Sequence, residues 1–162
     1  MATKTAASKS TKVKAIPDGY HSVTPYLIID GAARALDFYK RAFDAKELMR
    51  IPSPGDKIGH AEIKIGDSVI MLADEHPEMD ARSPTHFGGS PVSIMIYEED
   101  VDKQFKQALA AGGTELRPLT DQFYGDRSGT LKDPFGHSWH LSTHKEDVSM
   151  EEMNRRMAAM KK

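Results

Sequence analysis

The sequence predicts an α+β protein made of two similar units, each of which runs strand, helix, strand, strand, strand. Apolar runs rich in β-branched residues alternate with stretches in which apolar residues recur at helical spacing. Clusters of Gly, Pro, Asp and Ser separate these runs and mark the turns between elements. The order of elements in the first half recurs in the second half, and such an internal repeat bounds the architecture more tightly than any single motif.

In the first unit, strands are predicted at 21–29, 46–51, 60–65 and 68–73, and an amphipathic helix at 31–43. The strand at 60–65 (HAEIKI) alternates strictly between polar and apolar residues, which is typical of a half-buried strand. Gly66-Asp67 predicts a tight hairpin into the next strand. The stretch 74–89 is rich in Pro, Asp, Glu, His and Gly, and its acidic residues predict a solvated linker or mobile flap.

In the second unit, strands are predicted at 91–97, 114–118, 124–132 and 137–144, and a helix at 100–111. Gly112-Gly113 closes that helix. Aligning the two halves by their sequence pattern places Tyr39 on Phe105 and Asp67 on Asp133. We therefore expect a single domain over residues 16–148, with repeat units at about 20–74 and 90–145.

Composition excludes several classes of protein. The chain has 162 residues and no cysteine, which excludes disulfide frameworks, iron–sulfur clusters and thiol nucleophiles. Lys and Arg (22) nearly balance Asp and Glu (24), so no nucleic-acid surface is expected. No apolar run is long enough for a membrane helix, and the first residues lack the apolar core of a secretory signal. We expect a cytoplasmic protein with no membrane partner.

The two ends of the chain differ from the repeat. Residues 1–15 are rich in Lys, Ala, Ser and Thr and predict a disordered basic tail. Residues 149–162 predict a helix that starts at a capping box, Ser149 to Glu152. Its methionines form one stripe: Met150, Met153, Met157 and Met160. The stripe either packs onto the chain's own surface or docks onto a second subunit, where methionine adapts well.

Four segments carry a resemblance to a known family: TPYL (24–27), DFYKRAF (37–43), HAEIKIGDSVIMLAD (60–74) and DQFYGDRSGTLKDPFGHSW (121–139). Together with the repeat, they resemble the vicinal oxygen chelate superfamily of glyoxalases, bleomycin resistance proteins and dioxygenases, in its PhnB-like branch. The resemblance implies an eight-stranded cup built from two four-stranded curved sheets, with the helices outside, and a homodimer. In catalytic members of the family a divalent metal lies in the cup, and each unit supplies one ligand from its first strand and one from its last.

The resemblance allows these metal positions to be checked in this sequence. They fall at Val23 or Thr24, Met71, Val92 and His140. Only His140 is a competent ligand, and a divalent ion needs three or more nitrogen or oxygen donors. We therefore expect no cofactor. The alternative is a relocated site for Zn, Ni, Mn or Fe.

His60 and Glu62 are the polar residues most suggestive of chemistry, because strand alternation turns both toward one face, opposite Ala61 and Ile63. Together with His140 they form the candidate catalytic set and the candidate relocated metal site. Three interpretations are open: a hydrogen-bonded pair with no further role, an acid–base pair in which Glu62 fixes the tautomer of His60, or metal ligation. His137 and His140 project to opposite faces of their strand and do not indicate a zinc site.

The candidate ligand pocket is lined by Tyr26, Met71, Val92, Ile94, Tyr124 and Arg127. We expect Tyr124 to cap the cup and Arg127 to bind an anionic group, unless Arg127 is used in a salt bridge. Trp139 is expected in the core. The function predicted is binding of a small, partly apolar organic molecule without the family metal, and the sequence leaves open whether there is turnover. The alternative is a divalent-metal lyase, isomerase or dioxygenase.

Overall fold

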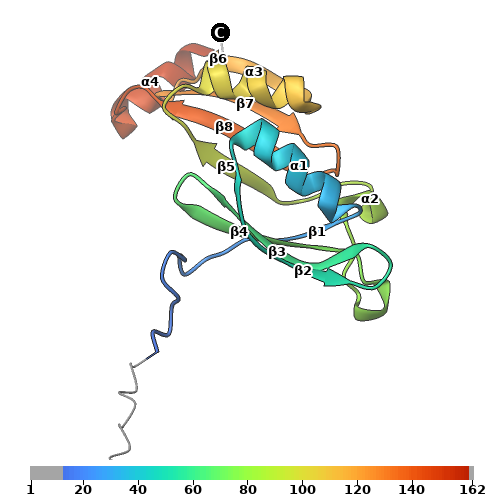
Figure 1. Ribbon diagram of the computed structural model, residues 1–162. Coiled ribbons are helices and arrows are strands. Elements are labelled where there is room, and N and C mark those ends of the chain that lie inside the picture. The colour runs from blue at the N-terminus through green and yellow to red at the C-terminus, as the bar shows by residue number, and fades with distance from the viewer. Residues whose placement is uncertain (1–12, 161–162) are drawn as a thin grey trace, which may run out of the picture.

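The computed structural model describes residues 13–160, which fold into two modules of the same topology followed by a C-terminal helix (Figure 1). The first module consists of β1 (Tyr26–Ile29), α1 (Ala32–Phe43), β2 (Lys46–Ser53), β3 (Lys57–Ile65) and β4 (Ser68–Asp74). A connecting segment carries the 3-10 turn η1 (Pro77–Met79) and the short helix α2 (Pro84–Phe87). The second module consists of β5 (Ser93–Tyr97), α3 (Val101–Ala111), β6 (Thr114–Asp121), β7 (Asp126–Lys132) and β8 (Ser138–His144). The last element is α4 (Met150–Met160).

The strands form two four-stranded sheets, in the orders β1-β4-β3-β2 and β5-β8-β7-β6. In each sheet the first strand of the module pairs in parallel with the last, and the remaining pairs are antiparallel. The α+β class and the duplicated strand–helix–three-strand topology are therefore confirmed. The eight strands divide into two four-stranded sheets, as the resemblance implied, and β1 and β5 each stand at a sheet edge.

The register corrects the predicted alignment of the two modules. Tyr26 lies opposite Met71 in the first sheet and Met95 lies opposite His140 in the second, so Tyr26 and Met95 are equivalent positions. The starts of the two helices, Ala32 and Val101, are equivalent in the same register. The predicted alignment of the two halves was therefore displaced along the chain by nearly one helical turn. A displacement of this size still places the apolar face of one helix on the apolar face of the other, so the sequence pattern matched despite the error.

Helix α1 begins at Gly31, whose φ of 94° is readily available only to glycine. Asp74, at the end of β4, accepts hydrogen bonds from the backbone N–H groups of Gly31 and Ala32 at 2.9 and 2.8 Å. Its other oxygen accepts from the N–H of Ile58 at 2.7 Å. The prediction that Asp74 belongs to a solvated acidic loop was wrong: this side chain is buried and fastens the start of α1 to the first sheet.

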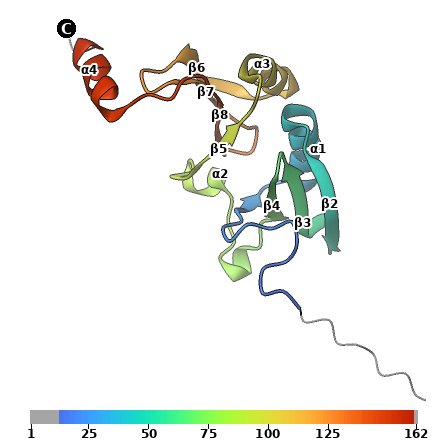
Figure 2. The ribbon, with the colours of Figure 1, turned by 90° about the vertical axis from the view of Figure 1, so that its left-hand side faces the viewer.

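The two modules share one core, and α1 is its centre. The ring of Phe43 lies 4.7 Å from that of Trp139 on β8, and the ring of Tyr39 lies 5.3 Å from it. Trp139 is fully buried, as predicted. Helices α1 and α3 also pack against each other, as Figure 2 shows from the side. The helix-facing sides of the two sheets are thus covered by the same set of apolar side chains.

A buried carboxylate ties α1 to the turn between β7 and β8. Asp133 accepts hydrogen bonds from the Tyr39 hydroxyl at 2.8 Å and from the Trp139 indole N–H at 2.9 Å. Its second oxygen accepts from the backbone N–H groups of Phe135 and His137, both at 2.9 Å. The Asp-Pro-Phe-Gly turn therefore has a structural role, because one buried acid satisfies four donors from both modules.

Helix α4 projects from the far side of the second sheet (Figures 1 and 2), and none of its residues from Met150 to Met160 is buried. Arg156 holds it through an ion pair with Glu146 at 2.8 Å and a hydrogen bond to the Phe123 carbonyl. Met150, Met157 and Met160 are 69%, 39% and 71% exposed, whereas Met153 is partly buried, so most of the stripe faces solvent.

Some expectations fall on residues that the structure does not describe. The predicted disordered tail lies mainly on residues 1–12, and the last residues of the predicted terminal helix are 161–162; both stretches are outside the described residues. Across residues 13–160, no helix combines the length and the apolar character that crossing a lipid bilayer requires.

Candidate functional site

A pocket of about 630 Å³ opens between the edge strands β1 and β5, next to α2. Apolar side chains of Val23, Tyr26, Ile28, Phe87, Val92, Ile94 and Met95 make most of its wall. The polar groups in the wall include Arg82, Ser93 and His137. The volume and the mixture of many apolar and few polar groups are typical of a small-molecule site.

Three of the predicted lining residues, Tyr26, Val92 and Ile94, are in this wall. Met71 instead borders a neighbouring hollow of about 420 Å³ between the first sheet and the preceding residues 15–24. Ile94 also packs against the core beside Trp139 rather than standing on the sheet's open face.

Arg127 and Tyr124 are outside the pocket. The guanidinium of Arg127 makes two 2.8 Å hydrogen bonds to the carboxylate of Asp102 on α3 and one of 3.2 Å to Asp121. Three of its five N–H donors are therefore used in salt bridges within the chain, the alternative to anion binding that the sequence left open. The Tyr124 hydroxyl lies 3.4 Å from Ser128 Oγ, over the second sheet.

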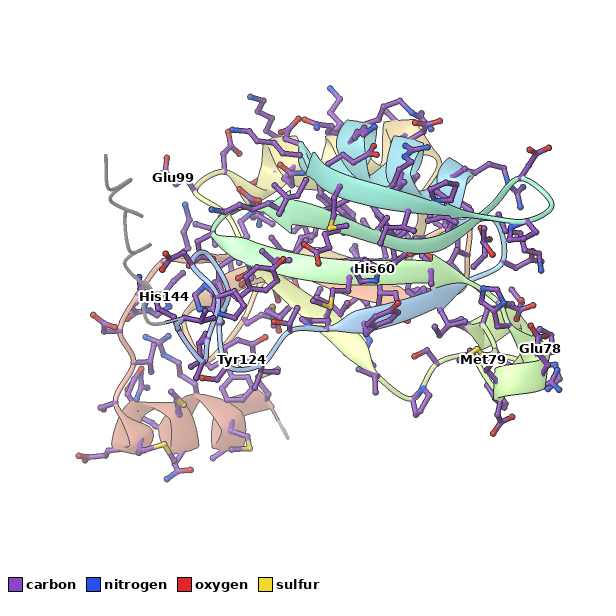
Figure 3. The ribbon with its side chains drawn as sticks, turned by 60° about the horizontal axis from the view of Figure 1, so that its bottom comes forward. His60, Glu78, Met79, Glu99, Tyr124 and His144 are labelled. Atoms are coloured by element: carbon purple, nitrogen blue, oxygen red, sulfur yellow. The ribbon has the colours of Figure 1, made fainter. Side chains whose placement is uncertain are left out.

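The open face of the first sheet, opposite α1, carries a continuous chain of hydrogen bonds. The Tyr26 hydroxyl lies 2.9 Å from His60 Nδ1, and His60 Nε2 lies 3.1 Å from Glu62 Oε1. The Tyr20 hydroxyl donates to the other carboxylate oxygen of Glu62. Figure 3 looks onto this face, with His60 over the sheet and the helices behind it. We call these four residues the tyrosine–histidine chain.

The direction of the hydrogen bonds follows from the charge of Glu62. The hydrogen bond from Tyr20 lowers the pKa of the Glu62 carboxyl against the opposing effect of burial, and His60 adds to the lowering. An ionised carboxylate only accepts, so His60 Nε2 carries a proton; in the neutral imidazole, Nδ1 is then the acceptor for the Tyr26 hydroxyl. Burial raises the pKa of Tyr26, which therefore stays a neutral phenol at neutral pH.

His140 is on the other sheet and has its own partners. Its Nδ1 lies 2.9 Å from Thr130 Oγ1, and its Nε2 lies 3.0 Å from Ser93 Oγ. The structure brings His60 and Glu62 together but does not bring His140 to them. In the part of the chain that the structure describes, no group of three or more acidic or histidine side chains is arranged to hold a metal ion.

The register shows which residues of the first strands lie opposite Met71 and His140. Strand β1 begins at Tyr26, after Pro25, and β5 begins at Ser93. The residues that face Met71 and His140 are therefore Tyr26 and Met95, not Val23, Thr24 or Val92. A phenol, two thioethers and one imidazole do not fit a divalent ion, which prefers carboxylate and imidazole donors.

Sequence reasoning missed two parts of this site. Tyr20 lies before the first strand in a segment with no periodicity, and nothing in the sequence indicates that it folds over Glu62. Phe87 lies on α2 in the predicted flap, which the sequence marks only by turn residues. The strict alternation of HAEIKI did place His60 and Glu62 on one open face, as observed.

A second polar cluster lies on the open face of the second sheet, far from His60 in Figure 3. Buried Asp126 accepts hydrogen bonds from His144 Nδ1 at 2.7 Å, the Tyr97 hydroxyl at 3.0 Å and Ser142 Oγ at 3.2 Å. Burial favours the neutral acid, but these three bonds together lower the Asp126 pKa. Asp126 and then Asp147 raise the pKa of His144.

The raised pKa of His144 predicts a pH-dependent contribution to stability. Stabilisation by the imidazolium is fully present below the unfolded-state pKa of about 6.5 and is lost as the pH rises through the higher folded-state pKa. Replacing His144 with Gln should therefore lower the unfolding midpoint in urea more at about pH 6 than at about pH 9. The comparison variant is His76→Gln, in the connecting segment. An equal loss for His144→Gln at both pH values would contradict this assignment.

The fold and the site together define a class: a duplicated strand–helix–three-strand protein with a small-molecule pocket between the edge strands of its modules. The family model for the Glyoxalase/Bleomycin resistance protein/Dioxygenase superfamily matches residues 20–141. The chain belongs to this superfamily, as the sequence predicted.

Two mycobacterial relatives extend the comparison. The chain is 43% identical over 141 residues to the uncharacterized protein Mb0911c of Mycobacterium bovis, and the match covers 85% of this chain and 93% of that protein. It is also 43% identical over 141 residues to the uncharacterized protein Rv0887c of Mycobacterium tuberculosis, and this match covers 85% of this chain and 83% of that protein.

Solved structures agree with the fold. TioX from Micromonospora sp. ML1 superposes with a TM-score of 0.60 at 27% identity, covering 80% of this chain and 99% of TioX. PA1353 from Pseudomonas aeruginosa gives a TM-score of 0.62 at 27% identity, covering 76% and 98%. A PhnB protein from Bacillus cereus superposes with a TM-score of 0.59 at 23% identity, covering 76% of this chain and 99% of that protein. At this identity the comparison shows a similar fold alone.

Proposed function

We propose that the protein binds a small, partly apolar organic molecule in the pocket between β1 and β5. The observation that carries the proposal is the pocket itself, with about 630 Å³ of space and a mainly apolar wall. Burying the apolar body of a ligand there gains roughly 25 cal/mol for each Å² removed from water. The few polar groups in the wall would fix the ligand's orientation.

Exposed apolar side chains around the pocket support the same proposal. Phe87, Val92 and Met95 are 69%, 67% and 46% exposed. Contiguous apolar surface of this kind on a protein is typical of a ligand or partner site. Arg82 and His137 lie at its border, so a ligand with one polar or anionic end suits it better than a hydrocarbon.

Metal-dependent lyase, isomerase or dioxygenase chemistry, the alternative that the sequence left open, has weaker support. The three residues of the relocated set are divided between the two sheets, and the family positions hold donors that suit a divalent ion poorly. Neither set supports metal-dependent chemistry as well as the pocket supports binding.

Filling the pocket tests the proposal. Val92 is exposed and lines the pocket, so Val92→Trp should fill the space without unfolding the protein. We expect an apolar fluorescent dye that binds the wild type to bind Val92→Trp at least tenfold more weakly, a change of about 1.4 kcal/mol. Isothermal titration measures the affinity, and circular dichroism checks the fold.

The matched control is Met79→Trp, which adds the same indole at a 77% exposed position outside the pocket wall. It should bind the dye as the wild type does. If Val92→Trp binds equally well, or if the dye does not bind the wild type, the proposed pocket is not the binding site.

The assembly that we propose is a homodimer in which the methionine stripe of α4 contacts a second copy. Met150, Met157 and Met160 of the stripe are exposed, although methionine packs readily against varied surfaces. On the outer strand β2, Leu48, Met49 and Ile51 are also 49%, 40% and 50% exposed. Light scattering on the purified chain should give twice the mass of one chain, and the mass of a single chain would contradict the dimer.

A further inference from the structure

We infer that the tyrosine–histidine chain is a proton relay, and that Tyr26 is the group that contacts the ligand. On this inference the pocket takes an aromatic or enolic molecule with an acidic O–H group, and removes that proton. The inference rests on the proposed function, because it needs a ligand in the pocket. It adds the chemical class of that ligand and the residues that act on it.

The first step of the argument is the position of Tyr26. Its side chain is about half exposed (49%), it belongs to the pocket wall, and its hydroxyl makes the first hydrogen bond of the chain, to His60. The pocket and the chain therefore meet at this one residue. His60 and Glu62 lie behind it, with side chains 23% and 9% exposed, where solvent competes less for their hydrogen bonds.

The second step is the direction of the hydrogen bonds. With His60 as the neutral imidazole, Tyr26 donates its only hydrogen to Nδ1, and a ligand that reaches the Tyr26 oxygen meets its lone pairs. A ligand hydroxyl can donate to that oxygen, whereas an ether or a carbonyl of the same shape cannot. The chain thus selects a hydrogen-bond donor at this point of the pocket.

The third step is the proton balance. The ligand O–H bond breaks and its proton goes to the Tyr26 oxygen, while the Tyr26 proton goes to His60 Nδ1. The products are a ligand oxyanion and an imidazolium, and no electron changes hands. Glu62 stabilises the imidazolium through the 3.1 Å contact with Nε2, and the hydrogen bond from Tyr20 keeps the carboxylate ionised. His60 and Glu62 are positioning residues, because they act through Tyr26.

A chromogenic probe tests the relay directly. Para-nitrophenol absorbs in the visible only when ionised, and para-nitroanisole has the same shape without the acidic hydrogen. We expect the wild type to bind the phenol about tenfold more tightly than the ether, which is the gain of one hydrogen bond. We also expect bound para-nitrophenol to show the ionised band at a pH where the free probe is mostly neutral.

Two variants separate the roles. Tyr26→Phe keeps the ring in the pocket wall, but this variant should bind the phenol no more than about threefold more tightly than the ether. It should also show no ionised band for bound para-nitrophenol. His60→Ala should keep binding but lose the ionised band, because no base remains behind Tyr26. A merely structural role for His60 would not change the spectrum of the probe.

The matched control is His76→Ala. His76 Nδ1 lies 3.2 Å from Glu78 Oε1, so it belongs to a second His-x-Glu pair, but that pair is outside the pocket wall. This variant should give the wild-type affinity and spectrum. A change in His76→Ala equal to that in His60→Ala would overturn the relay.

The outcomes distinguish the inference from the proposed function. If the phenol and the ether bind the wild type equally, or if Tyr26→Phe leaves the ionised band unchanged, the relay is wrong and the pocket remains. If neither probe binds and Val92→Trp has no effect on dye binding, the proposed function fails and the relay fails with it.

Discussion

Replacing Asp133 with Ala should lower the free energy of unfolding by about 4 kcal/mol. The substitution leaves four buried donors without an acceptor: the Tyr39 hydroxyl, the Trp139 indole and the N–H groups of Phe135 and His137. Each bond to a charged acceptor contributes about 1.5–3 kcal/mol, although the relaxed turn regains part of the loss through water. Urea denaturation followed by circular dichroism measures the difference.

Asp133→Asn refines the test, because it keeps one acceptor oxygen and replaces the other with a donor that meets the Tyr39 or Trp139 hydrogen. We expect a smaller loss, of about 2 kcal/mol. Asp67→Ala is the matched control, because Asp67 occupies the corresponding hairpin of the first module and its side chain is 86% exposed. It should change stability by less than about 0.5 kcal/mol. Similar losses for Asp67→Ala and Asp133→Ala would contradict the role given to the buried acid.

Replacing Phe43 with Ala should cost about 4 kcal/mol, within the usual range for a buried aromatic residue. Phe43 is 2% exposed and stands where α1 meets the second module. Its ring lies 4.7 Å from Trp139 and 6.0 Å from Tyr39, so its removal leaves a cavity between the modules. Thermal unfolding monitored by Trp139 fluorescence reports on this part of the core.

The comparison variant is Phe87→Ala, since Phe87 is 69% exposed and outside the core. Its unfolding free energy should stay within about 0.5 kcal/mol of the wild type. The interaction with Trp139 can be isolated by a double-mutant cycle with Trp139→Phe, for which we expect a coupling of about 1 kcal/mol. If Phe43→Ala unfolds like Phe87→Ala, the modules do not depend on a shared core.

The sequence predicted elements well where the periodicity was long and the turn chemistry distinct. The helix expected at 31–43 is observed at Ala32–Phe43, and the one expected at 100–111 at Val101–Ala111. Gly66-Asp67 indeed joins two antiparallel strands. In contrast, the strand expected from His21 begins only at Tyr26, because apolar composition does not show where a neighbouring strand supplies partners.

The site could be predicted only in part, for the same reason. Alternation along one strand placed His60 and Glu62 on an open face, which is local information. The partners of His60 and Arg127 come from segments distant in the chain, Tyr26 and Asp102, and no spacing rule gives them. The ligand positions expected in the first strands stay a prediction, and the residues that lie opposite Met71 and His140 depend on a register that the sequence does not give.

The two hairpins differ in how they contact the other module, because Asp133 bonds to Tyr39 of the first module. In the corresponding hairpin, Asp67 is exposed and accepts a hydrogen bond from its neighbour Ser68, so of the two hairpin acids it is Asp133 that bonds to the other module. The Asp67 hairpin makes no matching side-chain link to the second module within the described residues. That hairpin borders a second hollow, of about 610 Å³, whose other wall is β5. This hollow and the ligand pocket share Val23, Pro25, Ile94 and Met95, so the two spaces adjoin each other along β5.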